Sequence, residues 1–135
     1  MTSLFPEGLT QKAFDLLNKC SEESSGYSTS ELIDRAKIYL ERIRSAHSEN
    51  MFINLRLAEA MFSTMENVVE RWENLPSHSH PWLRGMMAYF TLTSDLESDF
   101  TSPIGFDDDV EIMNACLCHA GLHELCLNPE DYDDV

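Results

Sequence analysis

Lysine and arginine are missing from the last part of this 135-residue chain, because neither occurs after Arg84. Residues 1–84 hold all 9 basic residues and 12 of the 24 acids, whereas residues 85–135 hold the other 12 acids. The formal charge is thus −3 in the first part and −12 in the second. Affinity for a nucleic-acid backbone comes from cations that displace counterions from its phosphates. We therefore expect no direct nucleic-acid binding, and we expect a basic protein surface as partner. A charge that only keeps the protein dissolved is the alternative.

Long apolar runs are also missing. No stretch approaches the roughly 20 apolar residues that cross a bilayer, and the N-terminal segment contains Glu7 and no apolar run of signal-peptide length. We therefore expect a cytoplasmic protein without a membrane span. In that compartment cysteines are reduced thiols, which is the state expected for Cys20, Cys116, Cys118 and Cys126. Cys116 and Cys118 would point away from each other on a helix and are not expected to pair.

The motifs of several enzyme classes do not occur either. The chain has no serine in a nucleophile elbow, no glycine-rich phosphate loop and no Cys-x-x-Cys pair. Nucleophilic catalysis, nucleotide binding and thiol exchange by an oxidoreductase motif therefore have no basis in the sequence. These absences favour a non-enzymatic protein without a cofactor.

Strand patterns are lacking and only 5 glycines occur, so the sequence predicts an all-α fold. The length fits one domain, a compact bundle of four to five helices over residues 1–127 that is followed by an acidic tail, 128–135. The first helix is predicted to start near Pro6. The second follows Ser28, which has capping-box spacing to Glu31, and runs to about Ala46.

The strongest helical periodicity begins at Met51 and ends at Trp72, with apolar residues at spacings of 4, 3, 4, 3, 4 and 3. It predicts one long amphipathic helix that stops before Pro76. Its apolar stripe is expected in the core, although a ligand groove or a homodimer interface would use the same pattern.

Two further helices are predicted in the C-terminal part. One starts at SHSHPW, with Pro81 in its first turn, and ends near Thr93 or Ser94. The other runs from about Asp108 to Leu125. Between them an ordered acidic loop, DLESDFTSPIGFDDD, occupies residues 95–109.

This acidic loop resembles the signature of the YkvA-like family, a domain of unknown function. The family pattern runs approximately D-L-I-P-D-F-I-P-x-x-G-[aromatic]-x-D-D between two helices, and the resemblance covers about residues 86–120. In this chain Glu97-Ser98 and Thr101-Ser102 replace the two Ile-Pro pairs. The aspartates and the glycine of the pattern fall on Asp95, Asp99, Asp108, Asp109 and Gly105. The resemblance implies a small helical domain and transfers no mechanism.

Two interpretations of the acidic loop stay open. In the structural one, Asp108 caps the following helix, and acids in its first turn are favoured by the helix dipole. In the functional one, the loop binds a partner or ion through Asp95, Glu97, Asp99, Gly105, Asp107, Asp108 and Asp109. A divalent cation such as magnesium, manganese or calcium would be held by carboxylates, here those of Asp95, Asp99, Asp108 and Asp109. An EF-hand is excluded because Phe100 stands where that loop requires glycine.

The segment CLCHAGLHELC, residues 116–126, contains a second set of metal-ligand residue types. On a continuous helix, the spacings of 3, 4 and 3 would place on one side Cys116, His119, His123 and Cys126. The helical rise separates the first and last by about 15 Å, so only neighbouring residues could share a zinc ion. His119 and His123 are the predicted ligands, and packed or hydrogen-bonded histidines are the alternative. Additional ligands could come from another loop through His78 and His80.

The sequence thus favours a helical adaptor whose anionic C-terminal face binds a basic partner protein. An acidic inhibitor that mimics nucleic-acid phosphates is one alternative. A metal-dependent enzyme or metal sensor centred on Asp95, Asp99 and Asp108 is another.

Overall fold

A computed structural model describes residues 5–49, 54–91 and 107–132, except for the side chains of Asp107, Asp108 and Pro129. Within these ranges the chain forms helices and no strand, so the predicted all-α bundle is confirmed. The α-helices are α1 (Gln11–Glu23), α2 (Thr29–Glu49), α3 (Leu55–Glu70), α4 (His80–Phe90) and α6 (Asp107–His119). The short 3-10 helices are η1 (Trp72–Asn74), η2 (Ser77–Ser79), η4 (His123–Leu125) and η5 (Pro129–Tyr132).

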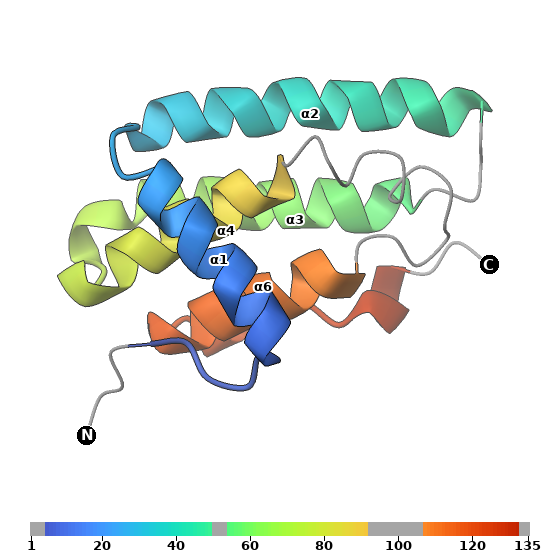
Figure 1. The fold of residues 1–135 in the computed structure, drawn as a ribbon. Coiled ribbons are helices and arrows are strands. Elements are labelled where there is room, and N and C mark those ends of the chain that lie inside the picture. Colours follow the sequence, from blue (N-terminus) through green and yellow to red (C-terminus); the bar gives the residue numbers. More distant parts are fainter. Residues whose placement is uncertain (1–4, 50–53, 92–106, 133–135) are drawn as a thin grey trace.

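Helix α4 lies at the centre of the bundle. It contacts α1, α2 and α6, while α2 also packs along α3. Figure 1 shows α2 and α6 on opposite sides of the molecule. The central position matches the composition of α4, most of whose side chains are buried, namely Trp82, Leu83, Met86, Met87, Tyr89 and Phe90. The core therefore forms around the fourth helix of the chain.

Short polar side chains define the starts of the first three helices. Thr10 Oγ1 accepts a hydrogen bond from the Ala13 amide at 3.1 Å, so α1 starts at Gln11. The predicted start near Pro6 is wrong because Gly8 adopts a φ of +88°, which a right-handed helix does not contain. Ser28 caps α2 as predicted, since its Oγ accepts from the Glu31 amide at 3.2 Å. The corresponding cap of α3 is Asn54, whose Oδ1 accepts from the Leu57 amide.

The third helix is shorter than predicted. It ends at Glu70, and Trp72 belongs to the 3-10 helix η1, while its predicted first residue, Met51, lies outside the described ranges. The stripe residues Phe62 and Val69 are only partly buried. The face packed against the protein is shifted from the stripe, and its buried residues are Leu57, Ala58, Met61, Thr64, Met65 and Val68. The core interpretation of this helix therefore holds with the face rotated slightly.

The fourth helix also ends earlier than predicted. Pro81 lies in the first turn as expected, but α4 ends at Phe90. Thr91 takes the C-cap position, and its Oγ1 donates a hydrogen bond to the Ala88 carbonyl at 2.9 Å. Such a back-bond from a threonine competes with continuation of the helix.

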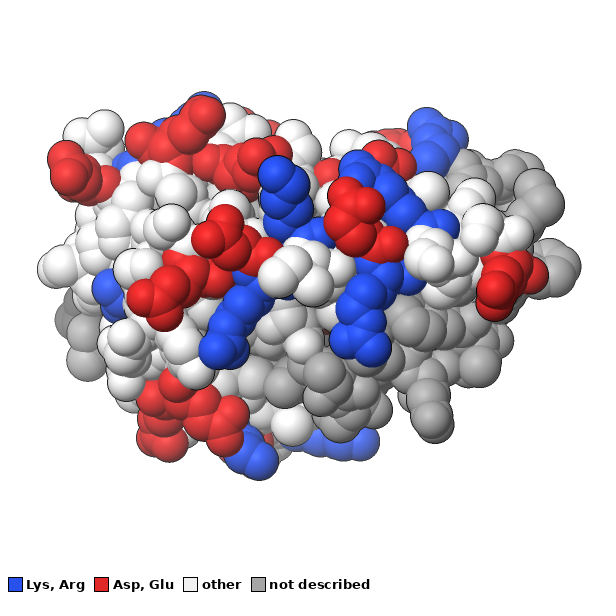
Figure 2. Space-filling view, turned by 90° about the horizontal axis from the view of Figure 1, so that it is seen from above, with Lys and Arg blue, Asp and Glu red and all other residues white. Residues whose placement is uncertain are grey.

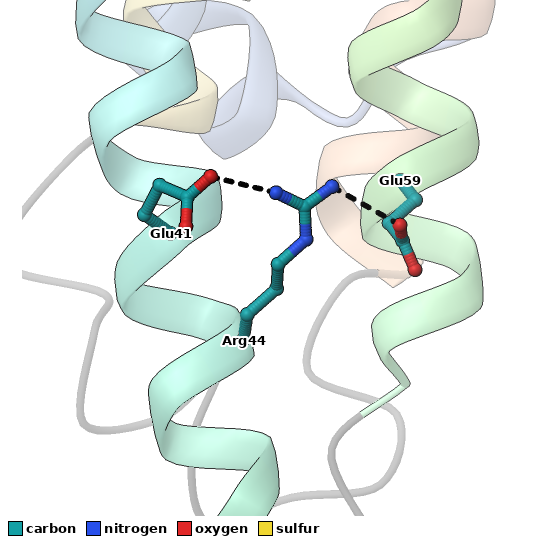
Figure 3. Close-up of polar contacts among 3 residues, drawn as sticks. All are labelled: Glu41, Arg44 and Glu59. Carbon is teal, nitrogen blue, oxygen red and sulfur yellow. Dashed lines mark hydrogen bonds and ion pairs between the residues drawn. The ribbon is translucent and has the colours of Figure 1, made fainter.

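Outside the core, Arg44 connects α2 to α3 (Figure 3). Its guanidinium lies 2.7 Å from the Glu41 carboxylate and 3.2 Å from that of Glu59. The hydrogen bond to Glu59 is the main cause that raises the pKa of Arg44 above its ordinary value. None of the described helices combines the length and the apolar character needed to span a bilayer.

Candidate functional site

The structure describes only the end of the acidic loop. Asp95, Glu97, Asp99 and Gly105 lie outside the described residues, so their predicted roles in binding a partner or a cation stay predictions. Helix α6 begins at Asp107, within one residue of the predicted start at Asp108. Asp109 is 8% exposed and engages another group of the protein. A carboxylate this buried contributes little to an exposed anionic face.

Helix α6 ends at His119, six residues before the predicted end at Leu125. Gly121 adopts a φ of +80°, which costs glycine little and most other residues more. The Leu122 amide donates to the Leu117 carbonyl at 2.8 Å, and the Gly121 amide donates to the Cys118 carbonyl at 3.0 Å. These two bonds form a Schellman motif, and the accompanying apolar contact is supplied by Leu117 and Leu122, which are both buried.

The predicted alignment of two cysteines and two histidines on one helix is therefore wrong beyond His119. His123 lies in η4 and is exposed, so it does not follow His119 on a common helix face. Cys116 is completely buried, and this burial strongly raises the pKa of its thiol. A thiol that is kept protonated and away from solvent is a poor metal ligand, because metals bind the thiolate.

The structure does bring His78 next to His119, at the junction of η2 and α6. Their ring centroids are 5.1 Å apart in an edge-to-face arrangement. Between them Ser79 is fully buried; its Oγ lies 3.0 Å from His119 Nδ1 and donates to the His119 carbonyl at 3.3 Å. His80 points elsewhere, since it stacks on Trp72 and its Nε2 lies 3.0 Å from the Trp72 carbonyl.

This histidine junction does not supply enough ligands for zinc. Structural and catalytic zinc sites use at least three protein ligands. In the described part of the chain, no three histidine, cysteine, aspartate or glutamate side chains come together. The predicted zinc role of His119 and His123 thus finds no geometric support, and the junction fastens the start of α4 to the end of α6.

Two adjoining hollows lie where α2 meets the end of α4. The larger has a volume of about 300 Å³, and the smaller has a volume of about 220 Å³. Both are lined by Arg35 and Thr91. The Arg35 guanidinium stacks 4.1 Å above the ring of Tyr27 and also donates to its hydroxyl at 2.9 Å. In the larger hollow Glu23 offsets the charge of Arg35, so that hollow does not select a ligand of one charge. The charged residues that line the smaller hollow are Arg35 and Arg42.

Charged side chains of both signs cover the α2 side of the bundle. Figure 2 shows the α2 side from above, where acidic and basic side chains alternate. Four of the 9 basic residues belong to α2, namely Arg35, Lys37, Arg42 and Arg44. The opposite side carries α6, and no basic residue follows Arg84 in the chain. Exposed acids described in this base-free part are Glu111, Glu124, Glu130 and Asp131.

One contact in the base-free part was missed by the sequence reasoning. The Asn114 side chain donates to the Leu127 carbonyl at 2.8 Å and accepts from the Leu127 amide at 2.9 Å. This pair of bonds holds the chain after η4 against α6 and places Cys126 Sγ 3.5 Å from Cys118 Sγ. The signal that could have indicated it is Gly121, a typical residue after the end of a helix.

Comparison with known proteins adds no relative. No family model matches the chain, and no match was found among curated proteins or solved structures. The resemblance of the acidic loop to the YkvA-like family accordingly stays a prediction.

Proposed function

We propose that this chain is a cytoplasmic, non-enzymatic adaptor that binds a basic surface of another protein. The observation that carries the proposal is the segment 85–135, which holds 12 acids and no base. Acids in such a segment have no neighbouring cations along the chain to compensate them. A positively charged partner is attracted to them over a Debye length of about 10 Å at 0.1 M salt.

The arrangement of the helices supports this proposal. Because α6 lies on the side of the bundle away from α2, the four bases of α2 are remote from it (Figure 1). Arg71 does reach the base-free part, where its guanidinium lies 3.1 Å from Glu124, but both side chains are about half exposed. Exposed pairs of this kind contribute little and exchange readily with other charges. A basic partner can therefore compete for these acids.

The test compares two variants that have the same net charge. The first neutralises acids of the base-free part by Glu111→Gln, Glu124→Gln, Glu130→Gln and Asp131→Asn. The second neutralises four exposed acids elsewhere by Glu22→Gln, Glu23→Gln, Asp34→Asn and Glu49→Gln. A fluorescently labelled peptide rich in lysine and arginine serves as the probe, and its Kd is measured by anisotropy.

We expect the first variant to weaken binding by about tenfold or more and the second to leave the Kd nearly unchanged. Binding of the wild type should also weaken steeply as NaCl rises from about 0.05 to about 0.5 M. Equal losses in both variants would mean that the peptide responds only to net charge. That result would overturn the proposal of a binding face.

A further inference from the structure

Cys118 and Cys126 come together because the chain reverses after α6. The Schellman motif at Gly121 ends the helix, and η4 then leads the chain back toward it. The two hydrogen bonds between the Asn114 side chain and the Leu127 backbone fix the returning segment. The sulfur atoms of the two cysteines lie 3.5 Å apart, and one thiol donates a hydrogen bond to the other. Cys126 Sγ also donates to the Asn114 carbonyl at 3.7 Å.

The pair is accessible, unlike the other two cysteines of the chain. Cys118 is exposed and Cys126 is partly buried. Cys20 is only 3% exposed and Cys116 is completely buried. A solution oxidant therefore meets Cys118 first, and the two buried thiols serve as internal controls.

We propose that Cys118 and Cys126 form a dithiol modification site that a low-molecular-weight disulfide, such as oxidised glutathione, converts into an intramolecular disulfide. A disulfide bond is about 2.0 Å long, so rotation of the two side chains has to shorten the observed separation by about 1.5 Å. This inference concerns the thiols alone and is independent of the proposed binding of a basic partner.

The reaction proceeds by two thiol–disulfide exchanges. The Cys118 thiolate attacks one sulfur of oxidised glutathione, whose S–S bond breaks and releases one glutathione thiolate. Cys126 then loses its proton to solvent and attacks Cys118 Sγ, which expels the second glutathione. The protein gives up two electrons and two protons, and one oxidised glutathione becomes two reduced ones.

The surroundings of Cys126 explain why it attacks only after Cys118 has reacted with glutathione. Partial burial raises the pKa of Cys126 to about 11, and the neighbouring Cys118 and Glu124 act in the same direction. The thiol is therefore mostly protonated at neutral pH. When Cys118 becomes a neutral mixed disulfide, its contributions to this pKa disappear and Cys126 deprotonates more easily. The exposed cysteine thus captures the oxidant, and the partly buried one resolves the adduct.

The experiment incubates the full chain with glutathione buffers of increasing oxidised fraction and follows it by mass spectrometry and thiol alkylation under denaturing conditions. Wild type should lose the mass of two hydrogen atoms and keep two alkylatable thiols, with peptide mapping placing the link between Cys118 and Cys126. Cys126→Ser should accumulate a glutathione adduct on Cys118. Cys118→Ser should react with oxidised glutathione at least about tenfold more slowly. The reason is that its remaining accessible thiol, Cys126, is partly buried and mostly protonated.

Positioning by Asn114 is tested separately. Asn114→Ala should lower the equilibrium constant for disulfide formation by about tenfold, because it frees the segment that carries Cys126. Asn67→Ala, which removes a side-chain hydrogen bond on α3, is the matched control and should leave this equilibrium constant unchanged. A persistent glutathione adduct in wild type, a disulfide-linked dimer or a link that involves Cys20 or Cys116 would each overturn the proposal.

Discussion

Cys116 and Cys118 are two residues apart on α6, yet their surroundings are opposite. Two residues correspond to about 200° of rotation around a helix, so one side chain faces the core and the other faces solvent. Cys116 is completely buried, whereas Cys118 is exposed. The same thiol group is therefore part of the core at one position and accessible to solvent, at the proposed modification site, at the other.

The buried thiol leads to a prediction for alkaline pH. Burial raises the pKa of Cys116, whereas in the unfolded chain a thiol has a pKa of about 8.5. Stability from this group is fully present below pH 8.5, and it falls as pH rises above that value because only the unfolded chain releases the proton. The loss should be about 1.4 kcal/mol for each pH unit above about 8.5.

Urea unfolding of wild type and Cys116→Ala between about pH 7 and pH 10 measures this effect. The variant should be less stable at neutral pH, because a buried side chain has been shortened. Its decline with pH should nevertheless be shallower than that of wild type. Parallel curves for the two proteins would contradict the assignment of the proton to Cys116.

At the scale of elements, the contact between α1 and α4 depends on Gly85. A Cβ atom at this position would lie 3.1 Å from the Ser21 backbone nitrogen and 3.2 Å from the Leu17 carbonyl oxygen. Close approach also allows Ser21 Oγ to donate to the Pro81 carbonyl at 2.9 Å. Glycine inside a helix costs about 1 kcal/mol relative to alanine, so the packing it permits outweighs its poor helix propensity.

Gly85→Ala should therefore destabilise the protein by about 1–3 kcal/mol, despite the better helix propensity of alanine. The reason is that backbone atoms of α1, which cannot rotate away, would have to shift. Gly26→Ala is the control, since nothing lies within 4 Å of a Cβ atom there and its φ is not positive. Chemical denaturation should show a change of less than about 0.5 kcal/mol for this control. An increase in the stability of Gly85→Ala would mean that α1 adjusts freely.

At the scale of the whole molecule, the formal net charge of −15 opposes compactness. Acids repel one another across a surface that has only 9 bases to offset 24 acids. The packed helical core must offset this repulsion, which salt screens. The same excess of negative charge is the basis of the proposal of a basic partner and of the alternative of a bound cation.

Thermal unfolding in matched salts separates these two possibilities. The Tm should rise by a few degrees as NaCl increases from about 0.02 to about 0.3 M, because screening reduces repulsion in the folded state. Magnesium and calcium chloride at the same ionic strength should give the same rise. A larger rise with either divalent ion would indicate a site that holds it in the folded protein, and would favour a metal centre over the adaptor.

The helices were predictable to different degrees at their two ends. The sequence predicts the Ser28 cap because its hydrogen bond with the Glu31 amide spans only three residues. Helices α4 and α6 end earlier than the sequence predicts. In α6 the reason is that Leu122 and Leu125 continue the apolar spacing past Gly121. A periodic pattern does not distinguish an apolar side chain in the last turn of a helix from one in a packed turn that follows it.

The sequence by itself determined that this protein is all-α and that its acids outnumber its bases most strongly after Arg84. Both properties are local, because helix periodicity and charge are read over neighbouring residues. Only the tertiary structure decided that α4 is the central helix, that Asp109 is buried and that Cys126 returns to Cys118. These three features depend on how segments pack after the chain has turned. The energy of such packing arises only when surfaces from distant parts of the chain are in contact.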